Sequence, residues 1–296
     1  MKQNKWKIAR RAVQITVVLV LFSPALGFRF FHGTLISAEV FGLPLTDPLA
    51  ALDYFLATRN LYLSLTVGAI LVLVFYFLVG GRVFCGWVCP MFLFAEYAEK
   101  LHKRIAVFNY QPKPAQKYWL LVFVLLLSLL TSRPIFELFS PIGIVSQNIA
   151  LGLDYPRAVF GSELALESGG AFGNEKEVIL NPQTERWRFL FNSSLWIVLT
   201  ILLIDLFVAK NWWCKFTCPV GALYSLVGRQ SPVKVQIDHQ ACDNCGECFA
   251  VCFVSEVLQA PVQGKSRWVM EGICSNCFNC VDACPQNALN PGLKIK

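Results

Sequence analysis

Four long runs of apolar residues alternate with more polar segments along the chain. They cover Ala12–Phe31, Leu61–Val79, Tyr118–Leu130 with its apolar continuation, and Phe189–Ala209. A helix needs about 20 mostly apolar residues to cross the hydrocarbon core of a bilayer. Pro24 interrupts the first run, but membrane helices tolerate such breaks when neighbours satisfy the freed backbone groups. The pattern therefore predicts four transmembrane helices.

Composition and charge support this interpretation and orient the helices. Of the 296 residues, 55% are hydrophobic and 15% are charged, whereas soluble domains average about 25% charged residues. Lys and Arg concentrate before the first run, between the second and third runs, and after the fourth. Because cytoplasmic loops carry the excess of Lys and Arg, both termini are predicted to be cytoplasmic. The net charge of +7 forms no extended basic face and accompanies no recognition motif, so we expect no nucleic-acid partner.

Two short motifs recur in the same order and indicate an internal duplication. Leu21-Phe-Ser-Pro24 in the first run is repeated as Leu138-Phe-Ser-Pro141 after the third. Cys85-x₃-Cys89-Pro90 after the second run is repeated as Cys214-x₃-Cys218-Pro219 after the fourth. The helices are thus predicted to form two repeated hairpins related by an axis along the membrane normal. A cleaved signal peptide is the alternative for the first run, and the repeat favours a retained helix.

Eight of the twelve cysteines form two runs typical of ferredoxins. Each run reads Cys-x₂-Cys-x₂-Cys-x₃-Cys, the bacterial pattern for [4Fe–4S] clusters, in which the fourth cysteine ligates the other cluster. The expected ligands are Cys242, Cys245, Cys248 and Cys284 for cluster 1, and Cys274, Cys277, Cys280 and Cys252 for cluster 2. Cys252 is followed by Phe253 where proline is usual, which changes the local turn more than the ligation.

Other uses of these cysteines fit the sequence less well. Zinc sites use paired Cys-x₂-Cys units, not triple runs. Disulfides need an oxidising compartment, whereas the charge pattern places these cysteines in the cytoplasm. A c-type haem needs Cys-x-x-Cys-His, and a dinucleotide needs a Gly-rich fingerprint; the sequence has neither.

The four remaining cysteines, Cys85, Cys89, Cys214 and Cys218, form the two Cys-x₃-Cys-Pro motifs. Positions i and i+4 share a helix face, so each pair could present two thiolates together. One hypothesis is a further redox or metal site built from all four. The alternative is a structural turn or a surface for docking another subunit.

Together, the four apolar runs, the paired Cys-x₃-Cys-Pro motifs and the C-terminal ferredoxin runs resemble the NapH family over nearly the whole chain. Related membrane ferredoxins are the C-terminal region of NosR, MauN and CcoG. The resemblance implies a multi-pass protein of the bacterial inner membrane, a subunit of a quinol dehydrogenase for periplasmic nitrate reductase. It also implies a NapG-like periplasmic iron–sulfur partner and a downstream cytochrome. The alternative function is a metal-reducing assembly factor or a regulator-type ferredoxin for a respiratory oxidase or reductase.

Quinol oxidation needs groups that accept protons, and ionisable residues inside membrane segments are functional candidates by default. Asp205 lies in the fourth apolar run, and His32 and Glu39 follow the first. All three are candidate quinol-proton acceptors. The alternatives are a charge pair for Asp205 and an ordinary solvated loop for His32 and Glu39.

These observations predict an α-helical membrane protein joined to a small α+β domain. Residues 1–230 are expected to form the transmembrane domain of four helices, and residues 231–296 a cytoplasmic ferredoxin-type domain with two [4Fe–4S] clusters.

Overall fold

The computed structural model describes residues 4–22, 31–33, 36–40, 42–105, 115–136, 140 and 193–294. The chain divides into two compact units. The first comprises Met1–Val17, Leu71–Leu126 and Leu202–Lys296, and the second comprises Val18–Ile70 and Leu127–Ile201. All twelve cysteines belong to the first unit, which therefore holds the candidate chemistry. The predicted boundary at residue 231 stays a prediction.

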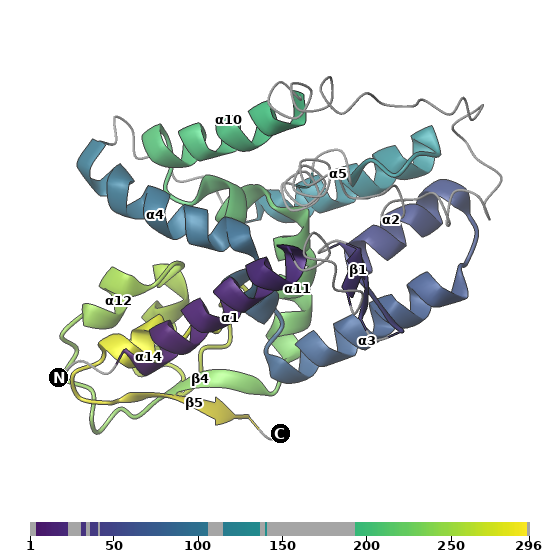
Figure 1. Cartoon of the computed structure of the whole chain (residues 1–296). Helices are drawn as coiled ribbons and strands as arrows, with labels where there is room; N and C mark the ends of the chain where they lie inside the picture. Colours follow the sequence, from purple (N-terminus) through teal and green to yellow (C-terminus); the bar gives the residue numbers. More distant parts are fainter. Residues whose placement is uncertain are drawn as a thin grey trace. The chain divides into compact units, whose positions relative to one another are not determined.

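Four long helices fall on the four predicted apolar runs (Figure 1). They are α1 (Lys5–Phe22), α3 (Leu63–Val79), α5 (Gln116–Thr131) and α10 (Ser193–Phe207). Helices α3, α5 and α10 have 17, 16 and 15 residues, and α1 has 18 but begins with a basic segment. Across the described ranges, no helix combines the length and apolar character needed to cross a membrane. The described helices therefore do not support the prediction of four spanning segments, because about 20 apolar residues are required.

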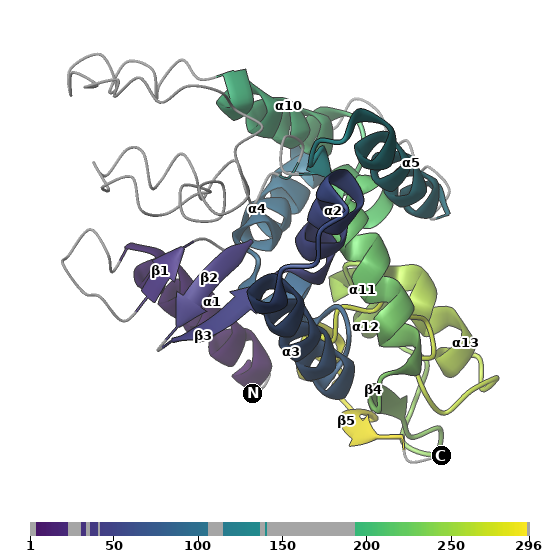
Figure 2. The same cartoon turned by 90° about the vertical axis from the view of Figure 1, so that its right-hand side faces the viewer.

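The segment between the first two apolar runs was expected to be a loop but contains a small sheet and a helix (Figure 2). Strands β1 (Phe31–Gly33), β2 (Ser37–Val40) and β3 (Leu43–Thr46) pair antiparallel in that order. Helix α2 (Pro48–Thr58) follows directly. Its N-cap is Asp47, whose side chain accepts a hydrogen bond from the Leu49 N–H at 2.8 Å, and Pro48 suits the first helical position. The Asp-Pro pair was the sequence signal for this helix.

Each Cys-x₃-Cys-Pro motif forms a π-helical turn followed by a regular helix. The turn η2 (Phe84–Val88) leads into α4 (Pro90–Ile105), and η3 (Trp213–Thr217) leads into α11 (Pro219–Gln230). The Cys89 N–H donates to the Phe84 carbonyl at 2.9 Å, and the Cys218 N–H donates to the Trp213 carbonyl at 2.8 Å. The predicted duplication thus extends to the local backbone of these motifs. The repeated Leu-Phe-Ser-Pro segments lie largely outside the described residues.

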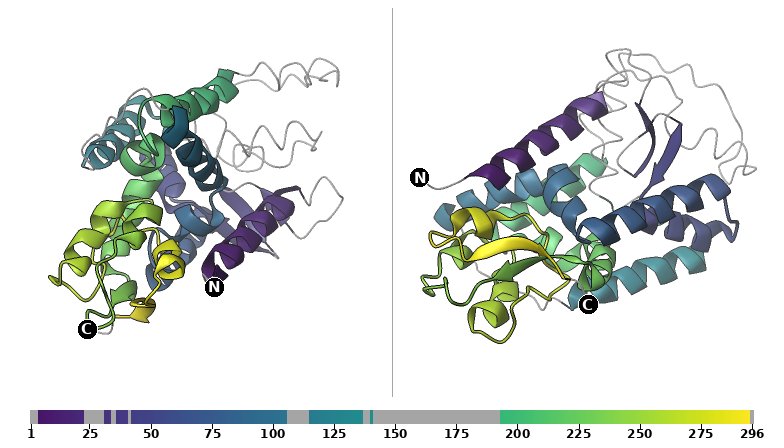
Figure 3. Two further views of the ribbon diagram at one scale, coloured as in Figure 1. Left: turned by 90° about the vertical axis from the view of Figure 1, so that its left-hand side faces the viewer. Right: turned by 90° about the horizontal axis from the view of Figure 1, so that it is seen from below.

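The ferredoxin runs lie in a compact α+β region (Figures 1 and 3). Strands β4 (Val233–Ile237) and β5 (Leu289–Leu293) pair antiparallel along the whole length of both. Between them in sequence come α12 (Glu247–Val251), η4 (Ser255–Leu258), α13 (Gln259–Val262) and α14 (Asn279–Ala283). Helices α12 and α14 pack against each other. This is the small α+β, two-run ferredoxin architecture that the sequence predicts.

The apolar core of this region includes residues from outside the predicted ferredoxin domain. Val235, Ile237 and Leu289 of the strands are almost fully buried, together with Leu258 of η4. Phe92 and Ala95 of α4 belong to the same core, and Phe92 stacks on Phe253 with ring centroids 4.8 Å apart. Burying such side chains contributes roughly 1.5–3 kcal/mol each. The helix after the first Cys-x₃-Cys-Pro motif is therefore a structural part of the ferredoxin region.

Candidate metal centres

The two ferredoxin runs have the same local backbone. Asn244 and Asn276, each two residues after the first cysteine of its run, have φ of 57° and 45°. Gly246 and Phe278, four residues after that cysteine, have φ of 82° and 56°. Asn and Gly reach this left-handed region most easily, whereas Phe278 is held there by its buried packing against Trp6 and Trp87. These turns wrap three cysteines of each run around one point.

The fourth cysteine of each run reaches the other run through the packed helix pair. Cys252 ends α12 and Cys284 ends α14. One cavity is lined by Cys242, Cys245 and Cys248 together with Cys284. A second cavity is lined by Cys274, Cys277 and Cys280 together with Cys252. The structure therefore gathers the two crossed sets of four thiols that the spacing of the runs predicts.

Both cavities suit an iron–sulfur cluster by their donor sets. Each presents four cysteine sulfurs within a wall of buried apolar residues, such as Ile237 in the first cavity and Val269 in the second. The Ala288 N–H also donates to Cys284 Sγ at 3.3 Å. Backbone N–H groups directed at thiolate sulfur tune the reduction potential of such clusters. Within the described residues, no three Cys, His, Asp or Glu side chains are close enough to hold one metal ion; in a [4Fe–4S] cluster each thiolate binds its own iron.

Burial controls the protonation of the thiols around the second cavity. It raises the pKa of Cys274 to about 11. It also raises the pKa of Cys252 and Cys280, and the charges of neighbouring cysteines act in the same direction. Thiols bind metals as thiolates, so iron binding here must displace protons from buried groups.

The first Cys-x₃-Cys-Pro motif packs on the start of the second ferredoxin run. Trp87 Nε1 donates to the Asn276 carbonyl at 3.0 Å. A Cβ placed on Gly86 would lie 3.2 Å from the Ser275 carbonyl oxygen and 3.5 Å from the Cys277 Cβ. Glycine is therefore needed at position 86 for this close approach. The residues of the motif thus lie directly beside the thiols of the second cavity.

The four thiols Cys85, Cys89, Cys214 and Cys218, which we call the thiol quartet, lie within electrostatic range of one another. Burial raises the pKa of Cys218 to about 12, with the charge of Cys85 as the next cause. Burial also raises the pKa of Cys89, assisted by Cys85 and Cys218. Burial also raises the pKa of Cys214, and the charges of Asp205 and of the other three cysteines act in the same direction. The structure thus brings together the two pairs that the sequence left as a hypothesis.

Two buried basic residues accompany the thiol quartet, and the sequence analysis did not identify either. Arg82 is 1% exposed and donates to the Ile273 and Cys214 carbonyls, both at 2.9 Å. Lys117 is also 1% exposed, and its Nζ donates to Ser225 Oγ at 2.9 Å. The sequence signal was weak: Arg82 stands three residues before Cys85, and the matching position before Cys214 is Asn211.

The three candidate quinol residues lie in different surroundings. His32 and Glu39 are direct cross-strand partners in the β1–β2 pair, so the sheet places them together. Asp205 is 2% exposed, and its Oδ1 accepts a hydrogen bond from the Trp213 N–H at 3.2 Å. This carboxylate therefore caps the π-turn η3, a structural task that the sequence did not suggest. The quinol role of all three residues stays a prediction.

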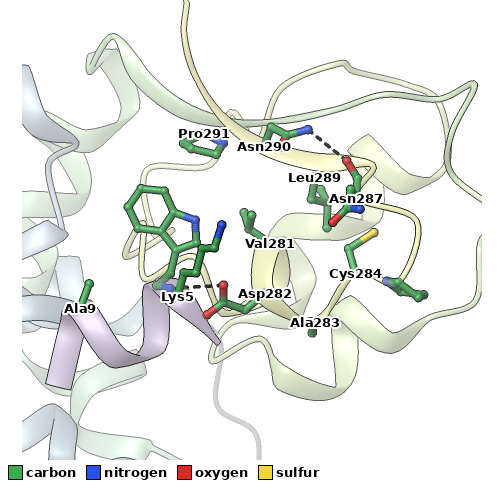
Figure 4. Close-up of a pocket in the computed structure, with 12 residues that line it drawn as sticks. Lys5, Ala9, Val281, Asp282, Ala283, Cys284, Asn287, Leu289, Asn290 and Pro291 are labelled. Carbon is green, nitrogen blue, oxygen red and sulfur yellow. Dashed lines mark hydrogen bonds between the residues drawn. The ribbon is translucent and has the colours of Figure 1, made fainter. Parts of the chain in front are cut away.

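An open pocket adjoins the first cavity (Figure 4). Its volume is about 790 Å³, and its walls come from Lys5, Trp6 and Ala9 of α1 and from residues 281–291. Asp282 fixes the start of α1, because its carboxylate accepts from the Trp6 and Lys7 N–H groups at 3.3 and 2.8 Å. Cys284 lines both this pocket and the first cavity. Solvent thus reaches one of the predicted ligands of cluster 1.

Paired, crossed cysteine runs on an α+β scaffold define an iron–sulfur protein of the ferredoxin type. Comparison with protein families agrees: a family described as "4Fe-4S binding domain" matches residues 61–108 and 192–237, and "4Fe-4S dicluster domain" matches residues 234–285. The chain is 30% identical to the ferredoxin-type protein NapH of Haemophilus influenzae, over 96% of this chain and 88% of that protein. It is likewise 30% identical to NapH of Escherichia coli, over 97% and 88%.

A second group of relatives is equally similar. The methylamine utilization ferredoxin-type protein MauN of Paracoccus denitrificans is 32% identical, over 92% of this chain and 84% of that protein. No solved structure matches the chain. The chain therefore belongs to the family of ferredoxin-type electron-transfer proteins that contains NapH and MauN, which confirms the family predicted from its motifs.

Proposed function

We propose that this protein is the iron–sulfur subunit of a membrane quinol dehydrogenase and passes electrons from quinol toward a nitrate reductase. The observation that carries the electron-transfer part is the pair of cavities, each lined by four cysteines drawn from both ferredoxin runs. Cys242, Cys245, Cys248 and Cys284 would hold one [4Fe–4S] cluster, and Cys252, Cys274, Cys277 and Cys280 the other. Such clusters, when bound, store and transfer single electrons.

The crossed ligation is supported by the helix pair. Because α12 and α14 pack together, the thiol that ends each helix is directed to the cavity of the other run. Each run therefore lines both cavities, and the continuous backbone of each run keeps the two cavities close together. Two one-electron sites suit a substrate that releases two electrons and two protons when quinol is oxidised to quinone.

The outer faces of the long helices support a membrane location. Large apolar side chains are exposed along α3 and α5 at spacings of three and four residues, which places them on continuous stripes. They include Leu63, Ile70, Val74, Phe75 and Leu78 on α3, and Trp119, Val122, Phe123, Leu126 and Leu130 on α5. Exposed apolar surface of this extent is typical of contact with lipid or protein. We propose lipid, with both termini and the clusters on the cytoplasmic side of a bacterial inner membrane.

The cross-strand pair of His32 and Glu39 is the best-supported candidate for accepting quinol protons. The sheet register makes His32 and Glu39 direct backbone partners, and an imidazole and a carboxylate are residue types that pass protons on. Asp205 is less suited, because its carboxylate already caps η3. On the acceptor side, Cys245 is exposed and Cys284 lines an open pocket, so cluster 1 is accessible to a partner on the cytoplasmic side. A NapG-like periplasmic partner would receive only electrons that cross the bilayer.

The decisive experiment measures cluster reduction by a quinol analogue in the purified full-length protein, reconstituted in lipid nanodiscs without oxygen. We expect the iron–sulfur absorbance to bleach on addition of quinol, and the Glu39→Gln variant to slow this at least tenfold. The matched control is Asp238→Asn, which removes an exposed carboxylate that lines neither of the two cavities with four cysteines. Clusters that dithionite reduces but quinol does not would reject the quinol role while leaving the iron–sulfur role intact.

A second measurement decides which pathway receives the electrons. The sequence is as similar to MauN as to NapH, in both cases over more than 90% of this chain. We propose the nitrate branch, and the following experiment decides between the two. Deleting the gene should abolish quinol-dependent nitrate reduction by the periplasmic enzyme. Unchanged nitrate reduction, with loss of growth on methylamine or of an oxidase, would contradict this branch.

A further inference from the structure

The first part of α1 joins the second ferredoxin run to the first Cys-x₃-Cys-Pro motif. The carboxylate of Asp282 in α14 accepts hydrogen bonds from the Trp6 and Lys7 N–H groups at 3.3 and 2.8 Å (Figure 4). The first N–H groups of a helix have no acceptor within the helix, so such a carboxylate fixes where the helix begins. Further along α1, Gln14 Nε2 donates to the Gly86 carbonyl of the first motif at 3.1 Å.

A buried ion pair holds the middle of this segment on α4. Arg10 is 1% exposed, and Arg10 and Arg11 both donate to the carboxylate of Glu96. The Arg10 guanidinium also lies over the Phe92 ring, 5.1 Å from its centroid. Charge-assisted hydrogen bonds are stronger than neutral ones. With contacts at its start, its middle and further along, α1 presents Trp6 in one fixed direction.

Three aromatic rings, which we call the aromatic cluster, meet where α1 contacts the second run. The Trp6 and Phe278 ring centroids are 4.7 Å apart, and each lies 6.3 Å from the Trp87 centroid. Such distances are typical of attractive ring pairs. Trp87 is held by its hydrogen bond to the Asn276 carbonyl. The three rings come from α1, from the first motif and from the second run, so the cluster forms only when these segments pack together.

The aromatic cluster stands between the open pocket and the cavity of the second run. Trp6 lines the open pocket, and Phe278 lines the cavity. Phe278 is 8% exposed, and Cys277 and Cys280 on either side of it are also buried. At the first cavity the same pocket reaches a predicted ligand directly, because Cys284 lines both. Water in the pocket therefore contacts a ligand of cluster 1, but it is separated from cluster 2 by two packed rings.

We propose that Trp6, together with Trp87 and Phe278, excludes water from cluster 2 and thereby lowers its reduction potential. Solvent exposure is one of the factors that set the potential of a [4Fe–4S] cluster. Reduction adds negative charge, and negative charge is less stable where water cannot solvate it. The proposal deepens the iron–sulfur role proposed above and rests on it. The family models match residues 61–108, 192–237 and 234–285, which do not include α1.

The experiment is a mediated redox titration of the full-length protein, purified in lipid nanodiscs without oxygen and followed by electron paramagnetic resonance. Cys242→Ser and Cys274→Ser variants assign the signals of clusters 1 and 2. Trp6→Ala should shift the potential of cluster 2 to higher values and leave that of cluster 1 nearly unchanged, because it opens the pocket toward Phe278. Trp6→Phe retains a ring and should restore most of the shift. The matched control is Ile8→Ala, at a side chain 68% exposed on the same helix, which should shift neither potential.

A second measurement tests the proposal on the wild type, so it does not depend on whether Trp6→Ala accumulates. After exchange into D₂O, pulsed electron paramagnetic resonance detects the solvent deuterium near each reduced cluster. We expect less deuterium near cluster 2 than near cluster 1 in the wild type. In Trp6→Ala, the deuterium near cluster 2 should increase.

Three results would overturn the proposal. They are an unchanged potential of cluster 2 in Trp6→Ala, a shift of the same size at both clusters, and equal deuterium near both clusters of the wild type. The proposed function can fail separately. A protein that binds no iron would overturn both proposals, whereas clusters that dithionite reduces but quinol does not would contradict the quinol role alone, since the titration uses mediators in place of quinol.

Discussion

The two cysteine-rich regions present the same ligand atom on different scaffolds. Each ferredoxin run is a loop with left-handed residues that continues into a five-residue helix, α12 in the first run and α14 in the second. The thiol quartet stands on π-helical turns, each continuous with a longer helix, α4 or α11. Cys245 in the first region is exposed, whereas the quartet surrounds a fully buried arginine.

From this difference we expect the ferredoxin runs to depend on metal for their conformation more than the quartet does. A cluster that joins four thiols contributes directly to the folding of the segments that supply them. The quartet is instead held by helix packing and by contacts such as Gly81 against Gly228. The predictions below test that contrast from the largest expected effect to the smallest.

Removal of iron should have the largest effect. Stripping the clusters with a chelator should unfold residues 242–284, expose the α4 residues that share their core, and leave α3 and α11 largely intact, because structural metals contribute on the order of 10 kcal/mol to small metal-bound domains. Amide hydrogen exchange read by mass spectrometry would show rapid exchange confined to the ferredoxin runs. Uniform loss of protection across both regions would show that the quartet region also depends on metal.

The next effect concerns the contact between α11 and the ferredoxin region. A Cβ on Gly272 would overlap the Ser225 carbonyl oxygen, so Gly272→Ala should cost about 3 kcal/mol of unfolding free energy or more, as severe overpacking does. Gly264→Ala is the matched control: its φ is +78° but nothing lies within 4 Å of the added Cβ. It should cost only about 1 kcal/mol. Denaturant unfolding of the iron-loaded proteins measures the free energy of unfolding of both variants. Equal costs would contradict a close contact between Gly272 and Ser225 of α11.

Trp87→Phe should produce a smaller change. It removes the hydrogen bond from Trp87 Nε1 to the Asn276 carbonyl, which is worth about 1 kcal/mol, and should shift the potential of cluster 2 more than that of cluster 1. Trp119→Phe, at a side chain 76% exposed on α5, is the control and should change neither quantity. A redox titration that shifts both clusters equally would contradict the direct contact with the second cavity.

The smallest effect is expected at the ion pair between buried Lys215 and half-exposed Glu256, whose Nζ and Oε1 atoms lie 2.6 Å apart. Glu256→Gln should cost about 1 kcal/mol, and the difference should become smaller in high salt. Burial acts to raise the pKa of Glu256, but the hydrogen bond and charge of Lys215 outweigh it and the pKa is lowered. The contribution is therefore present at neutral pH and is lost as the pH falls from about 4.5 through the lowered pKa. A pH series of unfolding curves checks the sign.

Much of the candidate site could be predicted from spacing alone. The crossed sets of cysteines follow from the two runs, since three closely spaced thiols wrap one point and a fourth must come from elsewhere. The pairing of Cys85–Cys89 with Cys214–Cys218 followed from the repeat. The β1–β3 sheet and helices α2, α4 and α11 were missed, because their segments are short or amphipathic and lie between stronger apolar signals. The predicted spanning segments were not supported by the described helices, since an apolar run does not fix where a helix begins and ends.

By itself, the sequence determined the chemistry of this protein: the ligand type, the number of thiol sets and the family. These depend on residue identity and local spacing, which the chain carries directly. Only the tertiary structure decided which charges are buried beside those thiols. In the sequence, Arg82 is an ordinary basic residue. In the folded protein it is buried, and it donates hydrogen bonds to the carbonyls of Cys214 and of Ile273, 191 positions away. Burial and electrostatics depend on packing between distant segments, and no local pattern encodes that.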